Sequence, residues 1–239
     1  MTEICSQCGN EYESIGIHWS QNKTCSHPSL SERQKEVIKG LLMGDGYVCK
    51  ANKTPSIECA MISKNYLDYV DKIFGKFSLG VSVKATPEEA AKRSRKSEFR
   101  PNGDKEDYKT IYRWMSMAHP EITEFSEWYS TGEKVWPESI ELTPTVLKHW
   151  YCGDGTYVNR KSSRHIQIAM LNEVNNRQKV NSMFRNSGLP APSNYNISTK
   201  NGEKVTCGAT FTVSQSEELF DYMGDPLPDF EYKWPEKYR

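Results

Sequence analysis

IKGLLMGDG at residues 38–46 and LKHWYCGDG at residues 147–155 are two copies of one pattern, and each ends in an aspartate between two glycines. The apolar residues before each GDG are spaced for one face of a helix, and the glycines end that helix. Asp45 and Asp154 therefore occupy equivalent positions at the ends of two similar helices. Two carboxylates placed in this way suggest one shared metal site.

Other segments repeat in the same frame, which indicates an internal duplication. IECAM at residues 57–61 and IQIAM at residues 166–170 are separated by the same number of residues as the two aspartates. A further echo pairs EKVWPE at residues 133–138 with YKWPE at residues 232–236. The chain is therefore expected to contain two similar halves.

Capping signals and apolar spacing predict the elements of each half. Ser31 and Gln34 form a capping box before the first motif helix, and Thr143 followed by Pro144 starts the second. Alternating segments after each motif helix predict a pair of strands, followed by a helix, two more strands and a final helix. A turn at Asn201-Gly202 would join the last two strands of the second half. Each half is thus an αββαββα unit.

The expected architecture is an α+β fold in which a pseudo-twofold pair of αββαββα half-domains forms a curved β-sheet saddle. We place the half-domains at residues 29–132 and 133–239, after a separate module at residues 1–28.

The glycines of the two motifs predict how the halves meet. Gly40 and Gly44 in the first copy and Gly153 in the second would let two helix backbones approach closely. The negative ends of both helix dipoles would then add to the two carboxylates and attract a divalent cation. Hard oxygen ligands suit Mg²⁺, with Mn²⁺ as a substitute. The expected ligands come from the ends of both motifs: Asp45, Asp154, Gly44 and Gly153.

Charge is balanced overall but clustered locally. The 31 basic and 31 acidic side chains give a formal net charge of zero, which by itself argues mildly against a nucleic-acid partner. KRSRKSEFR at residues 92–100 and RKSSRH at residues 160–165 are nevertheless strongly basic. One such run alone is typical of a solvated loop, but two at similar stages of a repeat favour contacts with DNA. The candidate arginines are Arg93, Arg95, Arg160 and Arg164.

Composition indicates a soluble intracellular protein. The chain is 239 residues long with 36% hydrophobic residues, enough for a buried core. Its apolar runs are too short for a membrane span, and MTEICSQCG at the start lacks the apolar region of a secretory signal. Seven cysteines, an odd number, make a disulfide framework less fitting than a metal site with additional reduced thiols.

The first 28 residues contain a set of zinc ligands. Cys5 and Cys8 form a CxxC knuckle, and His18 and Cys25 complete a four-ligand set, with His27 as the alternative to Cys25. A segment this short has too few apolar residues to order without metal. The alternatives are a disordered or disulfide-linked tail. A zinc module would either extend a DNA footprint or serve as a structural unit packed on the core.

Residues 31–239 resemble the single-chain LAGLIDADG homing endonucleases, on the basis of the two motif helices and the two Lys-Pro endings. The resemblance implies a monomer that cuts both strands of a long asymmetric DNA site and leaves short 3′ overhangs. It also implies that the lysine near the end of each half, Lys134 and Lys233, reaches the water network of the active site. His149 departs from the family, which often has Gly or Ala there, and is expected to pack against Gly40.

The resemblance also implies a major-groove surface made of strands. Outward-facing strand residues would contact bases or phosphates there: Glu58, His165 and Gln167. Proteins similar to this family also act as RNA splicing maturases, with intron RNA as a partner, or as DNA-binding regulators that do not cut. Because both motif aspartates are present, the nuclease is the favoured hypothesis. A metal-free binding module would not explain why the aspartates recur.

Overall fold

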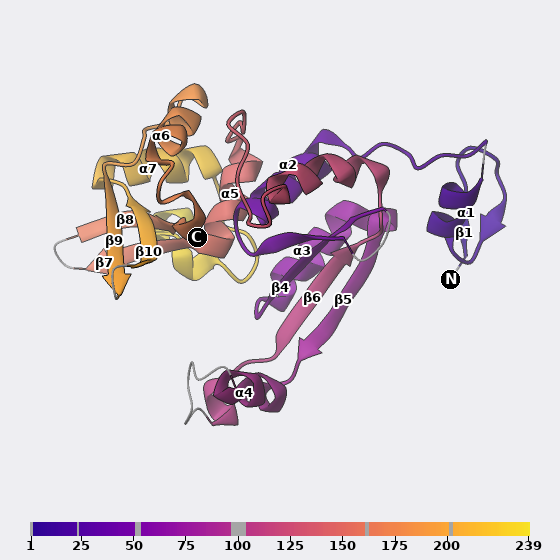
Figure 1. Cartoon of the computed structure of the whole chain (residues 1–239), viewed down its shortest axis with the longest axis horizontal. Helices are drawn as coiled ribbons and strands as arrows, with labels where there is room; N and C mark the ends of the chain where they lie inside the picture. Colours follow the sequence, from indigo (N-terminus) through magenta and orange to yellow (C-terminus); the bar gives the residue numbers. More distant parts are fainter. Residues whose placement is uncertain (1, 23, 51–53, 97–103, 161–162, 201–202) are drawn as a thin grey trace.

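The computed structural model describes residues 2–22, 24–50, 54–96, 104–160, 163–200 and 203–239. It contains two four-stranded antiparallel sheets, with two paired helices between them and a small module at the N-terminal end of the chain (Figure 1). The predicted α+β class and the two similar halves are confirmed.

The first half follows the predicted order with one insertion. After the first motif helix, its elements are two strands, a helix with a short 3₁₀ extension, a strand, an inserted helix and 3₁₀ turn, a strand, and a 3₁₀ helix. Their bounds are α2 (Glu32–Met43), β3 (Gly46–Cys49), β4 (Ser56–Met61), α3 (Lys64–Phe74), η1 (Gly75–Phe77), β5 (Ser78–Ala85), α4 (Pro87–Lys96), η2 (Lys105–Asp107), β6 (Ile111–Ser116) and η3 (Pro120–Tyr129).

The second half repeats this order without the insertion, has an α-helix where the first half has η3, and ends in two short 3₁₀ helices. Its bounds are α5 (Pro144–Asp154), β7 (Gly155–Arg160), β8 (Ser163–Ala169), η4 (Leu171–Glu173), α6 (Arg177–Asn186), β9 (Asn194–Lys200), β10 (Glu203–Thr210), α7 (Val213–Met223), η5 (Glu231–Lys233) and η6 (Glu236–Tyr238). The predicted turn at Asn201-Gly202 lies outside the described residues.

The duplication extends to strand order and register. The sheets are ordered β3-β4-β6-β5 and β7-β8-β10-β9, so equivalent strands occupy equivalent places. Gly46 at the start of β3 pairs with Cys59, and Gly155 at the start of β7 pairs with Ile168. Each motif helix therefore leads into the equivalent strand of its own sheet.

The motif helices begin where their capping residues predict. Ser31 accepts a hydrogen bond from the backbone of Gln34, whose side chain returns one to the Ser31 backbone. Thr143 accepts one from the backbone of Val146, with Pro144 at the first helical position. Local sequence thus fixes the start of both helices that carry the GDG motifs.

Two elements of the first half differ from the prediction. Helix α4 is inserted between β5 and β6, where the sequence analysis expected strand and loop. The last helix, η3, is a 3₁₀ helix rather than an α-helix. Its buried residues Ile122, Phe125 and Trp128 are three apart, a spacing that places them in line in a helix with three residues per turn.

Aromatic side chains fill the core between helices and sheets. In the first half, Phe74 of α3 packs on Trp114 of β6, with ring centroids 4.6 Å apart. In the second, Trp150 of α5 packs edge-on against Trp136 and contacts Phe184 of α6. The helices therefore cover one face of each sheet and leave the other face for the residues that alternate with the core. Among the described residues, no helix is long and apolar enough to cross a membrane.

The N-terminal module comprises β1 (Glu3–Ile4), β2 (Glu11–Tyr12) and α1 (Ile15–Gln21), and it packs on the end of the first sheet. The Trp19 ring lies 5.9 Å from that of Phe77, and the Lys76 ammonium lies 5.3 Å from the Trp19 ring. Nε2 of His119 and the carbonyl oxygen of Pro28 are 2.9 Å apart. The module is therefore attached to the first half through protein contacts.

Candidate active site between the motif helices

Helices α2 and α5 pack against each other through their glycines. A Cβ atom placed on Gly40 would lie 2.5 Å from the Cβ of His149 and 2.7 Å from the carbonyl oxygen of Val146. At the C-terminal ends, a Cβ on Gly44 would lie 3.5 Å from the Cα of Gly153. The predicted close approach of the two backbones is therefore observed.

Asp45 and Asp154 meet at these helix ends. Asp45 directly follows the Gly44 cap of α2, and Asp154 is the last residue of α5. The Oδ2 atom of Asp45 lies 3.6 Å from the point where a Cβ on Gly153 would be. Burial, together with the neighbouring charge of Asp45, raises the pKa of Asp154 to about 6. The structure thus brings together two carboxylates that are far apart in sequence.

Lys134 and Lys233 reach the same place, one at the end of each motif helix. The Nζ atom of Lys134 donates to the carbonyl oxygen of Gly44 at 2.6 Å. The Nζ atom of Lys233 donates to the carbonyl oxygen of Cys152 at 2.6 Å and to that of Gly153 at 3.3 Å. Burial lowers the pKa of both lysines below the ordinary value for lysine, and the nearby aspartates only partly oppose this shift. Each helix end therefore holds one lysine ammonium group close to the carboxylate pair.

The oxygen donors of this site fit a divalent cation. Asp45 is exposed and Asp154 is half-buried, so a cation can reach both carboxylates. The carbonyl oxygens of Gly44 and Gly153, which were expected as ligands, accept hydrogen bonds from the two lysines. A carbonyl oxygen has a second lone pair and stays compatible with a further contact. The carboxylates are accordingly the principal donors.

His149 belongs to the helix interface, as expected from its place opposite Gly40. Its side chain is buried, and its Nδ1 atom lies 2.6 Å from the hydroxyl oxygen of Tyr66. Burial, with smaller contributions from Lys148 and Arg33, lowers the pKa of His149 to about 3. The ring is therefore neutral and held by packing and one hydrogen bond.

The N-terminal module gathers four metal-ligand side chains. One ligand atom from each of Cys5, Cys8, His18 and Cys25 lies within 4.8 Å of the others. Four such atoms can surround one tetrahedral zinc, with bonds of roughly 2.0–2.3 Å. Three thiols and one imidazole also form a donor set typical of structural zinc.

His27, the alternative fourth ligand, lies outside this group. Its ring contacts the rings of Trp19 and His119, with centroids 5.7 and 5.2 Å apart. Burial lowers the pKa of His27, and the neighbouring His119 adds to the effect. Between the two alternatives, the geometry favours Cys25 as the ligand and places His27 between the module and the core.

The open face of the second sheet carries several of the predicted DNA-contact residues. Ile166 and Ile168 of β8 are buried on the side of the helices. His165 and Gln167 alternate with them and therefore point to the opposite face. Arg160 of β7 is exposed, and strand register places it on this open face as well.

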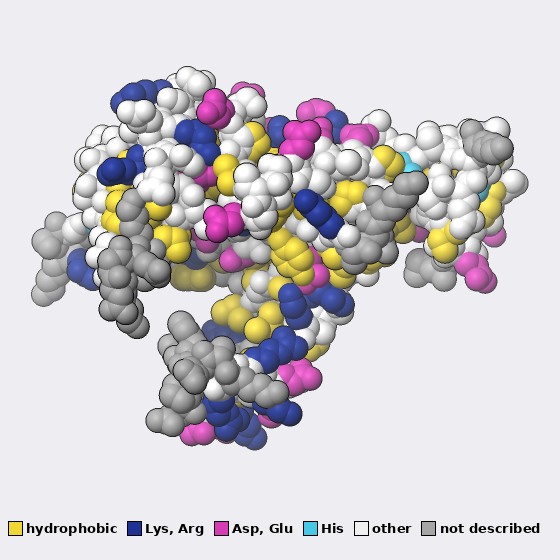
Figure 2. Space-filling model, viewed as in Figure 1, with side chains coloured by type: hydrophobic (Ala, Val, Ile, Leu, Met, Phe, Trp, Pro, Cys, Tyr) yellow, Lys and Arg dark blue, Asp and Glu magenta, His cyan; other side chains and the backbone are white. Residues whose placement is uncertain are grey.

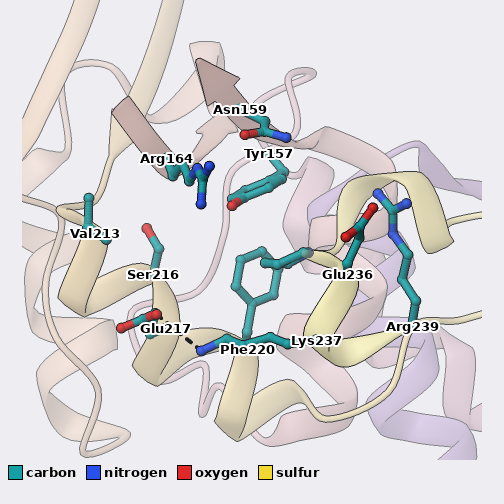
Figure 3. Close-up of a pocket in the computed structure, with 11 residues that line it drawn as sticks. Tyr157, Asn159, Arg164, Val213, Ser216, Glu217, Phe220, Glu236, Lys237 and Arg239 are labelled. Carbon is teal, nitrogen blue, oxygen red and sulfur yellow. Dashed lines mark hydrogen bonds and ion pairs between the residues drawn. The ribbon is translucent and has the colours of Figure 1, made fainter. Parts of the chain in front are cut away.

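Arg164 points to the other side of the second sheet. It pairs with Asn159 in the β7–β8 ladder, on the face that packs against α7. Figure 3 shows it pointing toward Tyr157 and Ser216 in a pocket of about 640 Å³. Arg164 was predicted as a DNA contact, but strand alternation places its side chain on the opposite face of the sheet from His165.

Glu58 faces the open side of the first sheet, as predicted, but it is not free for a partner. Only 4% of the residue is exposed, and its Oε1 atom accepts a hydrogen bond from Lys84 at 2.7 Å. Although burial opposes the change, hydrogen bonds from Lys84 and Tyr47 lower the pKa of Glu58. A direct contact of this carboxylate with DNA is therefore not supported.

The first basic run begins on α4. Arg93 and Arg95 are exposed on this helix, and Figure 2 shows Lys and Arg side chains gathered over it and the adjoining strand ends. Residues 97–100 of this run and residues 161–162 of the second run lie outside the described residues. The described part of the first run is therefore an exposed basic helix at the far end of β5.

Sequence analysis missed polar side chains on the open faces of three strands. They are Lys84 of β5, Arg113 of β6, and Asn194 and Asn196 of β9. Polar and apolar residues alternate in NYNIS at residues 194–198, so a signal was available for β9, but they do not alternate in IYRWMS. What was missing was the knowledge of which face the helices cover.

Comparisons with known proteins agree with this arrangement. Residues 35–199 match the model of the LAGLIDADG DNA endonuclease family. No curated protein matches the chain. Among solved structures, the homing endonuclease I-WcaI bound to its DNA recognition sequence has a TM-score of 0.65 and 15% identity, covering 93% of this chain and 92% of that one. Mesophilic variants of the homing endonuclease I-DmoI give a TM-score of 0.47 and 13% identity, covering 83% of this chain and 95% of that one.

Proposed function

The chain belongs to the LAGLIDADG DNA endonuclease family, and on this premise we propose that it is a site-specific endonuclease that cuts both strands of a DNA duplex. The observation that carries the proposal is the meeting of Asp45 and Asp154, with Lys134 and Lys233 beside them. One set of groups is present for each strand of the duplex. The expected products carry short 3′ overhangs.

In this proposal the aspartates hold Mg²⁺, or Mn²⁺ in its place. When bound, the metal supplies a water molecule of lowered pKa and neutralises charge on the attacked phosphate. Lys134 and Lys233 are anchored on helix-end carbonyl oxygens, so their positive charge stays beside the reacting phosphates. There they stabilise the charge that develops on the phosphate oxygens and orient the attacking water. Packing between Gly44 and Gly153 keeps the two sets of groups together.

The open faces of the two sheets form the proposed DNA surface. Strands β3 and β7 start directly after Asp45 and Asp154, so both faces extend away from the carboxylates. Arg160, His165 and Gln167 lie on one of them, and the exposed basic helix α4 would contact phosphates beyond the other. Because one chain supplies both aspartates, a monomer is sufficient for double-strand cleavage.

For the N-terminal module we propose a structural zinc site formed by Cys5, Cys8, His18 and Cys25. Packing of Trp19 against Phe77 supports a structural unit docked on the first half.

The charge of the module supports the same conclusion. Residues 1–28 contain three glutamates and one lysine, Lys23, which lies outside the described residues. A negative module is poorly suited to DNA phosphates. We propose that the half-domains follow this module at residues 29–132 and 133–239.

Cleavage of a randomised DNA library tests the proposed function. Purified protein with Mg²⁺ should cut a subset of duplexes, and sequencing of both ends should show one enriched site with 3′ overhangs. Asp45→Asn and Asp154→Asn should retain binding to that site but not cut it. Specific binding without any cutting by the wild-type protein would instead support a DNA-binding regulator, and retained cutting by both variants would refute the assignment of the site.

A further inference from the structure

The open faces of the two sheets differ in chemistry, and we propose that they read different bases: the first sheet reads guanine through Arg113, and the second reads adenine through carboxamide side chains. This inference rests on the proposed function, because it assigns a preference to each arm of the DNA site. It is carried by the side chains that each face presents and by the hydrogen bonds that they still have available.

Arg113 lies in the middle of the open face of the first sheet. On strand β6 it pairs with Ala60 of β4 on one side and with Ser82 of β5 on the other. These neighbours are small, so they leave room above the sheet for the guanidinium group. Trp114, the next residue, is fully buried on the helix side, which confirms that Arg113 points away from the core.

The guanidinium group of Arg113 still needs a hydrogen-bond acceptor. Its Nε atom is buried without a hydrogen-bond partner, and none of the residues that the structure describes accepts a hydrogen bond from it. An external ligand cannot reach this buried atom, so the donors available to a base are the two terminal nitrogens, which make no hydrogen bond to the residues that the structure describes. Arg113 is half-buried, which leaves part of the group open to a ligand.

Glu58 positions the charged groups around Arg113. Its carboxylate accepts from Lys84 at 2.7 Å and also interacts with Tyr47 and Arg113. The Lys84 ammonium lies 5.7 Å from the Tyr47 ring. Lys84 is thereby occupied within the protein, whereas the guanidinium group keeps its donors. Arginine donating to N7 and O6 in the major groove is the commonest contact that selects guanine.

The open face of the second sheet is lined by amides and hydroxyls. The side-chain nitrogen of Asn194 donates to the side-chain oxygen of Asn196 at 3.0 Å, and the nitrogen of Asn196 donates to the Thr210 hydroxyl at 2.9 Å. This chain of bonds fixes the orientation of both amides. The oxygen of Asn194 and the second hydrogen on its nitrogen remain available, and Asn194 is exposed.

Gln167 adds a third carboxamide on the same face. A Cβ on Gly208 would lie 2.4 Å from Nε2 of Gln167, so the absence of a side chain at Gly208 gives the amide its place on the sheet. Within the described ranges, no hydrogen bond ties down this amide. A carboxamide presents one acceptor and one donor side by side, the pattern that pairs with N6 and N7 of adenine.

Sequencing of cleaved duplexes from a randomised library tests the inference with the full-length protein and Mg²⁺. The wild-type protein should enrich guanine in one arm of the site and adenine in the other. Arg113→Gln should reduce the guanine preference about ten- to hundredfold at one or two positions of the first arm only. Asn194→Ala and Gln167→Ala should do the same for adenine in the opposite arm.

Arg185→Gln is the matched control, because Arg185 is exposed on α6, on the side of the second sheet away from the open face. It should leave the base preferences of both arms unchanged. Cutting at an enriched site whose guanine preference survives Arg113→Gln would overturn this inference and leave the proposed function intact. A library that shows no cleavage by the wild-type protein would overturn the proposed function and this inference with it. Thermal unfolding of each variant shows whether a lost preference reflects a lost fold.

Discussion

The Cβ atom of His149 lies 2.5 Å from the point where a Cβ on Gly40 would be, so these two residues set the distance between the motif helices. The Cβ of His149 lies beside Gly40, and the imidazole Nδ1 is hydrogen-bonded with the hydroxyl of Tyr66 in α3. The close packing of His149 on a glycine is therefore one contact that joins the two halves. Substitutions at either residue can therefore test how the two helices pack.

Replacing Gly40 should destabilise the protein. The new methyl group of Gly40→Ala would overlap His149 and the Val146 carbonyl, which forces the helices apart. We expect a loss of about 1–3 kcal/mol in the free energy of unfolding, measured by chemical denaturation. Lys39→Ala, at the preceding residue of the same helix, is the control and should change this free energy by less than about 0.5 kcal/mol. Equal effects of the two substitutions would contradict the interpretation of the interface.

His149 should make stability depend on pH. The folded protein keeps His149 neutral down to about pH 3, whereas the unfolded chain takes up a proton near its ordinary pKa of 6.5. The unfolded state therefore binds more protons between these values, so stability falls as the pH decreases, by at most about 1.4 kcal/mol per unit. In His149→Asn, which keeps an acceptor for Tyr66, this part of the slope should be absent. Denaturation curves at pH 7 and pH 5 for both proteins measure it, and identical slopes would argue against a buried neutral ring.

Removing either active-site lysine should slow cleavage while DNA binding persists. Lys134→Met and Lys233→Met keep the length of the side chain but remove the charge beside the carboxylates. We expect each to lower the single-turnover cleavage rate about a hundredfold, a typical loss for one charge-stabilising group. Lys148→Met removes another half-buried lysine, which lies near Gly224 rather than near the aspartates. If Lys134→Met and Lys233→Met cut as fast as Lys148→Met, the proposed roles of Lys134 and Lys233 are wrong.

Zinc content should distinguish the two candidates for the fourth ligand. Cys25→Ser should lose zinc because Cys25 belongs to the four-residue cluster, whereas His27→Ala should retain it. Metal analysis of the purified full chain measures the ratio of zinc to protein, with Cys49→Ser as a control cysteine outside the cluster. Zinc loss in His27→Ala but not in Cys25→Ser would reverse the assignment.

Chelation should act on stability rather than on base preference. The module docks on the first half through Trp19, so removal of zinc should lower the melting temperature of the whole chain. Trp19→Ala should reduce the effect of zinc removal on the melting temperature. A melting temperature that does not change with chelator would show that the module is energetically separate.

The sequence predicted the parts of the site that depend on repetition. The common frame of Asp45 and Asp154 was sufficient to place them together, because duplicated halves meet through equivalent surfaces. The lysines were assigned by resemblance, and their contacts with the helix ends are consistent with that assignment. Capping residues such as Ser31 and Thr143 located the helix starts to the residue.

Other parts depend on tertiary placement and could not be predicted in the same way. Arg164 lies next to His165 in sequence but on the opposite face of the sheet, and only the helix layer reveals which face is covered. Glu58 was correctly assigned to the outward face, yet its engagement by Lys84 joins residues from different strands. Helix α4 was missed although its signal was present, since Thr86 and Glu89 form reciprocal side-chain to backbone hydrogen bonds around Pro87.

The dissimilarity of the two open faces bears on how this protein can change over time. In a symmetric dimer, any substitution on a strand would appear twice and would alter both arms of a target together. Here β6 and β9 belong to separate halves of one polypeptide, so a substitution at Arg113 leaves Asn196 and its neighbours as they were. A lineage with this architecture can adapt to mutations in one arm of its target while it still binds the other arm. Protein engineers can likewise change the specificity for one arm at a time.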